Sequence, residues 1–429
     1  MLVRLTLLCW LLFVSNEQFG YARSFLKVGT AAREITAPAG TPFRNFPIRE
    51  ESGPVTGDRI ATGTHDPMMA KALVMQEGEV TVALVALDLS RFKRNAIAEV
   101  RARVTRRIDI PAENIIIGAT HTHNSPAIED NERHTVDKNK VHGIYDIVAD
   151  IVVEAYENLQ PARIGVGRGE ANLAFNRRLL TTDNRVIFLK RNTDRKYTGI
   201  VDREVGVIRI DGPSGYGLAT IVNFAAHPMT LGMAFRQFSA DYPGATTRHL
   251  ETILHNAWGP PMRTLFFNGA LGNLVPYEAE TGDPATMESV GITLAEEVNR
   301  VYQNIPMSMH AGLAVMHRTL TYENQQTTGQ METIDIDAIF LNNTVLVTAP
   351  GELFVELGLE FKRRSPYLHS FVLGLTGGRV DYIANEAAYQ FGGYGANTQV
   401  SVPHDLGTRI VQTWLDMAYE HLGEPIVQY

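Results

Sequence analysis

The chain has 429 residues, of which 45% are hydrophobic and 20% are charged, and these proportions are typical of a globular protein with a large core. The formal net charge is −8, and acidic and basic residues are mixed along the sequence without a basic stripe. This charge pattern excludes a nucleic-acid-binding protein, which would carry a basic surface.

The N-terminus has the pattern of a secretory signal peptide. Arg4 precedes an apolar run from Leu5 to Val14, and Gly20-Tyr21-Ala22 supplies the small-x-small motif of a cleavage site. The apolar run is shorter than the ~20 residues that a bilayer-crossing helix needs, so we predict no transmembrane segment. We therefore expect a signal peptide over residues 1–22 and a secreted or periplasmic mature protein.

Short β runs alternate with stretches of helical periodicity, and no repeat or long linker interrupts them. The alternation predicts an α/β fold, with a layered mixed β-sheet core flanked by helices, in one large domain over residues 23–429. The predicted strands are Val80–Leu89, Ile115–Ala119, Gly217–Ala226, Thr264–Phe267, Ala338–Leu341, Thr344–Thr348 and Phe371–Leu375; Asn342-Asn343 forms a hairpin turn; and the predicted helices are Arg94–Arg107, Tyr145–Asn158, Glu352–Arg363 and Thr408–His421.

The segment Asn114 to Pro126, NIIIGATHTHNSP, carries two histidines directly after a predicted strand. Side chains at positions i and i+2 of an extended segment point to one side, so His121 and His123 are expected to converge on one metal ion or one substrate atom. Such a pair is weak on its own, because histidines also occur as ordinary core or surface residues.

Other polar residues follow the ends of later predicted strands: His227, Glu352 and Tyr382. Because the loops after strand carboxyl ends line the active cleft of α/β folds, we expect these side chains to meet His121 at one site. Cys9, the single cysteine, lies in the predicted signal peptide. Histidines with a carboxylate and no thiolate suit zinc in a catalytic role.

Each candidate also has a structural interpretation. His227 precedes a proline and can simply end a strand, and Glu352 can be a first-turn carboxylate favoured by a helix dipole. Tyr382 can be a packing residue, and Arg177-Arg178 can be a solvated basic pair. The joint pattern decides between these interpretations.

That joint pattern resembles the catalytic N-terminal domain of the neutral/alkaline non-lysosomal ceramidase family. The resemblance begins near Val28 and consists of nine motifs in matching order. They are KVGTAAREITAPAG, ALVALDLS, ATHTHNSP, FNRR at Phe175–Arg178, NFAAHP at Asn223–Pro228, SADYPG at Ser239–Gly244, FNGALGN at Phe267–Asn273, APGE at Ala349–Glu352 and DYIANEAAY at Asp381–Tyr389.

The resemblance implies a role for each matching residue. One Zn²⁺ per chain would be bound by four ligands: His121, His227, Glu352 and Tyr382, the last lying seven residues before Tyr389 as in the family. His123 would contact the substrate and act in catalysis, together with Tyr382. The family's substrate-binding arginine matches Arg177, beside Asn176.

The sequence also departs from the family pattern. Asn273 and Val275 stand where the family's Gly-Asp-Val-Ser-Pro segment has aspartate and serine, and Ala384-Asn385 replaces a Thr-Thr pair. Asn124-Ser125-Pro126 replaces Ser-Gly-Pro after the histidines. The chain ends at Tyr429, where full-length family members continue into an immunoglobulin-like domain, so we expect the catalytic domain without that extension.

These features together predict a secreted zinc-dependent hydrolase that cleaves an N-acyl amide bond with zinc-activated water. The expected substrate is ceramide or a related small-molecule or lipid N-acyl compound. Two alternatives stay open: an esterase or deacylase acting on a non-ceramide substrate, and a non-catalytic binding protein that retains zinc.

Overall fold

The structure is a computed structural model that describes residues 24–43, 59–128, 137–197, 199–255, 259–397 and 400–423. The predicted signal peptide over residues 1–22 lies outside the described residues. None of the described helices combines the length and the apolar character that crossing a membrane requires.

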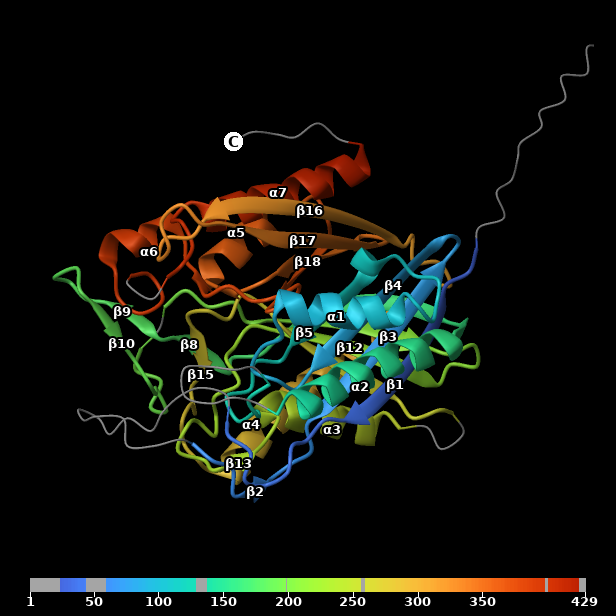
Figure 1. The fold of residues 1–429 in the computed structure, drawn as a ribbon, viewed down its shortest axis with the longest axis horizontal. Helices are drawn as coiled ribbons and strands as arrows, with labels where there is room; N and C mark the ends of the chain where they lie inside the picture. Colours follow the sequence, from blue (N-terminus) through green and yellow to red (C-terminus); the bar gives the residue numbers. More distant parts are fainter. Residues whose placement is uncertain are drawn as a thin grey trace, which may run out of the picture.

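Three larger mixed sheets form the centre of the described chain (Figure 1). The first has the order β5 (Ile115–Ala119), β4 (Val80–Leu87), β3 (Met69–Glu77), β1 (Lys27–Glu34), β6 (Gln160–Pro161). The second has the order β14 (Arg263–Asn268), β12 (Gly217–Phe224), β11 (Glu204–Asp211), β7 (Arg163–Glu170). The third has the order β16 (Ala314–Glu323), β17 (Met331–Leu341), β18 (Thr344–Ala349), β20 (His369–Gly374).

Short strand pairs surround these sheets. They are β2 (Gly63–Thr64) with β13 (Gln237–Phe238), β8 (Ala174–Asn176) with β15 (Leu274–Pro276), β9 (Arg178–Leu180) with β10 (Val186–Phe188), and β19 (Glu352–Leu353) with β21 (Tyr382–Ile383). Two further short helical segments are η1, a 3-10 turn (Ala112–Asn114), and α6 (Glu386–Phe391).

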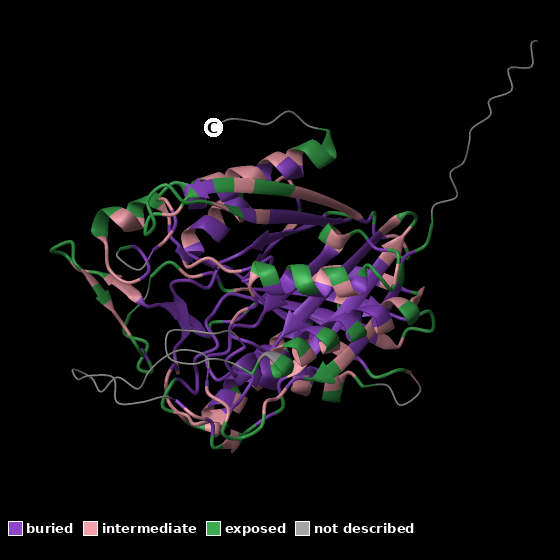
Figure 2. Ribbon diagram, in the orientation of Figure 1, coloured by how far each residue is buried: buried purple, intermediate pink, exposed green. Residues whose placement is uncertain are grey.

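Both faces of the three sheets are covered, and most of each sheet is buried (Figure 2). The inner faces share one apolar core, to which the sheets contribute residues such as Leu84, Leu265 and Leu373. Because strand side chains alternate between faces, the neighbouring residue Val85 instead joins the outer core of the first sheet.

A pair of helices covers the outer face of each sheet. The pairs are α1 (Arg94–Val104) with α2 (Lys138–Glu157), α3 (Asp241–Ile253) with α4 (Pro284–Tyr302), and α5 (Val355–Arg364) with α7 (Leu406–Leu422). The arrangement confirms the predicted α/β fold class with a layered mixed-sheet core flanked by helices.

Each larger sheet contains one parallel strand pair: β4 with β5, β12 with β14, and β18 with β20. The first and third sheets meet at the carboxyl ends of these strands, where the amide of Ala119 donates to the carbonyl of Leu375 at 3.1 Å. The residues that follow the parallel strands are therefore brought to one place, as the strand-end rule predicts.

The predicted helix start at Glu352 is wrong. Glu352 lies in β19, paired in parallel with Tyr382 of β21, and α5 begins only at Val355. The amide of Phe354 donates to the carbonyl of Ile383 at 2.9 Å, which holds the chain extended before the helix. Glu352 is therefore not a first-turn helix carboxylate.

Candidate metal centre

His121 stands at the carboxyl end of β5 in a left-handed conformation, with φ of 68°. The segment is therefore not extended at this residue, and the simple i, i+2 argument does not describe how the two histidines meet. Nδ1 of His121 lies 2.6 Å from the carbonyl oxygen of Ser90. Because a carbonyl oxygen only accepts, Nδ1 carries the proton and the lone pair lies on Nε2.

His227 follows β12 and is fully buried. Its Nδ1 donates to the carbonyl oxygens of Leu271 and Leu274, at 2.8 and 2.9 Å, so its lone pair also lies on Nε2. Burial and the nearby Arg177 guanidinium lower the pKa of His227 to about 3. The ring is therefore neutral at pH 7, which is the form that binds metal ions.

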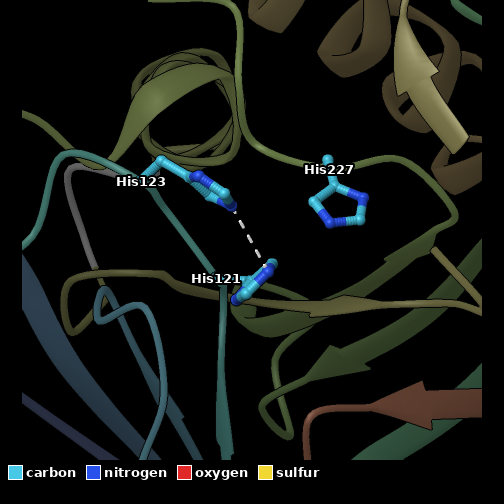
Figure 3. Close-up of side chains that lie close together, drawn as sticks. All are labelled: His121, His123 and His227. Carbon is cyan, nitrogen blue, oxygen red and sulfur yellow. Dashed lines mark hydrogen bonds between the residues drawn. The ribbon is translucent and has the colours of Figure 1, made fainter. Parts of the chain in front are cut away.

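The three imidazole rings of His121, His123 and His227 are turned toward one another (Figure 3). One ring nitrogen from each lies within 4.8 Å of the others, and the Nε2 atoms of His121 and His123 are 3.4 Å apart. Burial, with His121 and His227 nearby, holds the pKa of His123 well below its usual range. His123 is therefore also neutral.

Glu352 adds a carboxylate to the three histidines. Its Oε1 lies 3.4 Å from Nε2 of His121 and accepts a hydrogen bond from Nη2 of Arg379 at 2.8 Å, while its Oε2 lies 3.1 Å from Nε2 of His227. Burial acts to raise the pKa of Glu352, but its contacts with these neighbours outweigh burial and hold that pKa well below its usual range. Glu352 is therefore ionised.

These distances fit a bound divalent metal ion. A tetrahedral site with metal–nitrogen and metal–oxygen bonds of about 2.1 Å places its ligand atoms about 3.4 Å apart. Nε2 of His227 and Oε2 of Glu352, which are both acceptors, lie 3.1 Å apart, and a cation bound between them would stabilise this arrangement. Nitrogen and carboxylate donors without a thiolate suit zinc among the common metals.

Arg177 and Tyr382 lie beside this cluster. Nη2 of Arg177 donates to the carbonyl of Gly272 at 2.7 Å and to the hydroxyl of Tyr382 at 3.0 Å. The same Nη2 lies 3.2 Å from Nε2 of His227. Burial, with the Glu352 carboxylate nearby, raises the pKa of Tyr382 well above its usual range. Tyr382 is therefore a neutral phenol that can donate a hydrogen bond.

Asn176 has a different position from the other predicted residues. Its Nδ2 donates to the carbonyl of Ile200 at 3.1 Å, and its Oδ1 accepts from the amide of Arg178 at 3.0 Å. The side chain thus ties the two residues that flank Arg177 into the surrounding backbone. Its contacts support the placement of Arg177, while substrate binding by Asn176 stays a prediction.

Two of the residues that depart from the family pattern, Val275 and Asn273, have defined contacts. Val275 packs in an apolar cluster with Phe175 and Met229. Asn273 accepts a hydrogen bond from the amide of Val355 at 2.8 Å and donates to Glu356 at 2.9 Å, so it holds the start of α5. Both side chains are thus occupied by contacts within the protein.

Sequence reasoning did not identify Tyr394 or Arg379. The hydroxyl of Tyr394 accepts from that of Tyr382 at 3.2 Å, and its ring lies 5.1 Å from the Arg177 guanidinium. The sequence does carry a local signal for Tyr394, the glycine-rich segment Gly392-Gly393-Tyr394-Gly395, and all three of its glycines have positive φ. Such a loop presents one side chain in a defined direction. Arg379 has a similar local signal, because it directly follows Gly377 and Gly378, which both have positive φ.

Known proteins are similar to this chain in sequence. The family model described as "Neutral/alkaline non-lysosomal ceramidase, N-terminal" matches residues 52–278. "Neutral ceramidase A" of Dictyostelium discoideum is 26% identical over 237 residues, which cover 52% of this chain and 31% of the relative. "Neutral ceramidase" of Oryza sativa subsp. japonica is 24% identical over 234 residues, which cover 52% of this chain and 28% of the relative. The matches thus span about a third of the relatives' length.

Solved structures share the fold. Neutral ceramidase from Pseudomonas aeruginosa matches with a TM-score of 0.76 and 17% identity, covering 94% of this chain and 76% of that one. A ceramidase complexed with C2 matches with a TM-score of 0.74 and 16% identity, and it also covers 94% of this chain and 76% of that one. The family match covers more than half of the sequence, and the fold agrees with it. The chain belongs to the neutral/alkaline non-lysosomal ceramidase family.

Proposed function

We propose that this protein is a zinc-dependent amide hydrolase that cleaves the N-acyl bond of ceramide or of a related N-acyl lipid. The observation that carries the proposal is the convergence of His121, the neutral His123 and His227, and the ionised Glu352 in one buried cluster. Family membership supports the reaction class, since the relatives that match are neutral ceramidases.

The contacts support a division of roles within the cluster. His121 and His227 each have Nδ1 fixed by backbone carbonyls, which is the usual way in which proteins orient a metal-binding imidazole. Together with Glu352 and Tyr382 they would hold one zinc ion per chain. His123 is the most exposed of the three histidines, at 8%, so it is the one best placed to meet a substrate.

A zinc ion at this site would supply a bound water molecule with a pKa of about 7 and would polarise the amide carbonyl. His123 is neutral, so it can accept a proton from water and return it to the departing amine. Tyr382 and Arg177 are hydrogen-bond donors on the same side and would stabilise the developing oxyanion. Arg177 would also anchor a polar group of the substrate.

A second candidate is hydrolysis of a different N-acyl or O-acyl compound. The observation that favours it is Val275, which lies in an apolar cluster where family members have a serine, so no hydroxyl is available there for a sphingoid headgroup. Turnover of ceramide, N-acyl amino acids and acyl esters with matched acyl chains would separate the two candidates.

The test of the proposal is metal analysis combined with activity. Purified protein should carry about one zinc per chain, and His121→Ala and His227→Ala should each lose most of it. Glu352→Gln keeps the shape of the side chain and removes its charge, so activity should collapse. Stoichiometric zinc in the His121→Ala/His227→Ala double variant would place the metal elsewhere and overturn the assignment.

The proposal includes a cellular location. The predicted signal peptide over residues 1–22 makes the mature hydrolase domain, residues 23–429, a secreted or periplasmic enzyme. This location is compatible with a lipid or small-molecule substrate that is met outside the cytoplasm.

A further inference from the structure

One short segment, Ser239-Ala240-Asp241, lies between the two loops that carry the clustered histidines. Asp241 is fully buried and is the first residue of α3. Its φ of 55° is in the left-handed region, which residues other than glycine adopt rarely. Strained residues of this kind persist where the surrounding contacts require them.

Asp241 binds the loop that follows His227. Its Oδ1 accepts from the amide of Thr230 at 3.1 Å and from its neighbour Tyr242 at 2.8 Å, and its Oδ2 accepts from the amide of Leu231 at 3.1 Å. Thr230 and Leu231 stand three and four residues after His227. The carboxylate thus fixes the end of the turn that presents this histidine.

Ser239 binds the other histidine loop. Its amide donates to the carbonyl of Asn124 at 3.1 Å, and its carbonyl accepts from Oγ1 of Thr122 at 2.7 Å. Thr122 stands between His121 and His123 and is fully buried. Ser239 therefore holds the backbone on both sides of His123.

A hydrogen bond links the residue that contacts the His227 loop to the residue that contacts the His121–His123 loop. The amide of Asp241 donates to Oγ of Ser239 at 2.9 Å, and that hydroxyl donates in turn to the carboxylate of Asp66. Asp66 also accepts from the amide of Ala240 at 3.1 Å and from Arg248 at 2.7 Å. The segment is thus anchored to the protein independently of either histidine loop.

We infer that the Ser239–Asp241 segment is a clamp that sets the position of the His121–His123 loop relative to the His227 loop, and so sets the affinity of the cluster for metal. These residues are positioning residues, since they do not touch the cluster themselves. The inference rests on the proposed metal-binding function of the site. The clamp has two arms: the contacts of Asp241 with the His227 loop, and the contacts of Ser239 with the His121–His123 loop. We expect that breaking either arm weakens metal binding, and that the effects of breaking both are not independent.

The experiment is a double-variant cycle with zinc affinity as the readout, measured by chelator competition on the purified full chain. Thr122→Val removes the hydroxyl of one arm, and Asp241→Asn removes one acceptor of the other while keeping a residue that tolerates positive φ. Each should weaken zinc binding about 10- to 100-fold, as for other groups that orient metal ligands. The double variant should lose less than the product of the two, because one broken arm already frees the loops.

A second Asp241 variant, a control variant and a second readout make the result specific. Asp241→Gly suits the left-handed backbone but lacks the carboxylate, so it should also lose affinity. Asp211→Asn alters another buried carboxylate, which binds Arg209 and Tyr302, and it should lower Tm with zinc affinity unchanged. In the cobalt-substituted protein, the visible absorption spectrum should change in Thr122→Val and Asp241→Asn and stay the same in Asp211→Asn.

Specific results would overturn the clamp. These are unchanged zinc affinity in Asp241→Asn, retained affinity in Asp241→Gly, or strictly multiplicative losses in the double variant. If Asp241→Asn does not fold, Ser239→Ala removes only the joining hydroxyl and should give a smaller loss in the same direction; unchanged affinity there would count equally against the clamp. A wild-type protein that binds no zinc would instead refute the proposed function.

Discussion

Arg379 donates a hydrogen bond from Nη2 to Oε1 of Glu352 at 2.8 Å, on the oxygen that also lies 3.4 Å from His121. The guanidinium therefore fixes which way the carboxylate faces and offsets part of the cost of burying its charge. Arg379 acts on the cluster through Glu352, and it would orient this residue as one of the proposed metal ligands.

Arg379→Gln should weaken zinc binding about 10- to 100-fold, because it frees Glu352 to turn away from His121. Zinc affinity measured by chelator competition checks this expectation. The matched control is Arg318→Gln, which breaks an exposed ion pair with Glu420 and should leave affinity unchanged. Equal affinities in the two variants would show that Glu352 does not need Arg379.

His123→Ala should keep zinc and lose activity. If His123 moves protons in the reaction, kcat should fall about 10²- to 10⁴-fold while the zinc content stays near one per chain. Arg177→Ala should also keep zinc and lose activity. Loss of zinc from the His123 variant would instead make His123 a ligand, which the three-histidine geometry also permits.

The stability of the metal-free protein should fall at acid pH. Burial lowers the pKa of His227 to about 3 and that of His123 well below its usual range, so below about pH 6.5 the unfolded chain binds more protons than the folded one. Burial raises the pKa of Asp88 and of Asp241 to about 6, which opposes this trend between about pH 4 and 6.

Below about pH 4 the opposing carboxyl groups become protonated in both states, while Glu352, whose folded pKa is low, adds to the loss of stability. We therefore expect the free energy of unfolding to change little from pH 6 to about 4 and to fall steeply below that. Urea denaturation of the metal-free protein at stepped pH values measures it. A free energy that is constant down to pH 3 would contradict these pKa directions.

Ceramide should be a poorer substrate than an N-acyl or O-acyl compound without a sphingoid headgroup, because Val275, which packs with Phe175 and Met229, offers no hydroxyl to that headgroup. A missing hydrogen bond to a buried partner typically costs ~1 kcal/mol or more. Val275→Ser should therefore raise kcat/KM for ceramide relative to the best alternative substrate. Efficient hydrolysis of ceramide by the wild type would make this inference from Val275 wrong.

Asn273→Asp serves as a companion to the Val275 variant. Asn273 donates to Glu356 at 2.9 Å, so an aspartate would place two carboxylates together at the start of α5. We expect a lower Tm for Asn273→Asp and little gain in ceramide turnover unless Glu356 is changed as well. The Asn273→Asp/Glu356→Gln double variant should recover the lost stability.

The secreted protein should begin near Arg23. N-terminal sequencing of material recovered outside the cytoplasm measures this directly. Intact cytoplasmic protein that starts at Met1 would show that the apolar run is not a cleaved signal.

The sequence predicted those parts of the site that depend on strand ends. Ile115–Ala119 is observed with the predicted bounds, and the rule that loops after strands meet at one edge correctly brought His121, His227 and Glu352 together. These predictions succeeded because the hydrophobic pattern of a buried strand is local in the sequence.

Other features depend on contacts between distant segments and have no local pattern. The left-handed backbone of His121 is held by the contact of its amide with Leu89 at 2.9 Å, and the extended backbone of Glu352 is held by its pairing with Tyr382. Helix α3 begins at the strained Asp241 and contains Pro243 and Gly244, which obscured its periodicity. In each case tertiary contacts override the local preference.

The three sheets contribute separately to the candidate metal centre: His121 follows a strand of the first, His227 one of the second, and Glu352 and Tyr382 follow strands of the third. No sheet alone holds a complete ligand set. A nascent or partly unfolded chain with only two sheets docked therefore offers an incomplete site and competes poorly for metal. Binding of the proposed zinc ion would then be a late event in folding, restricted to chains in which all three sheets have docked.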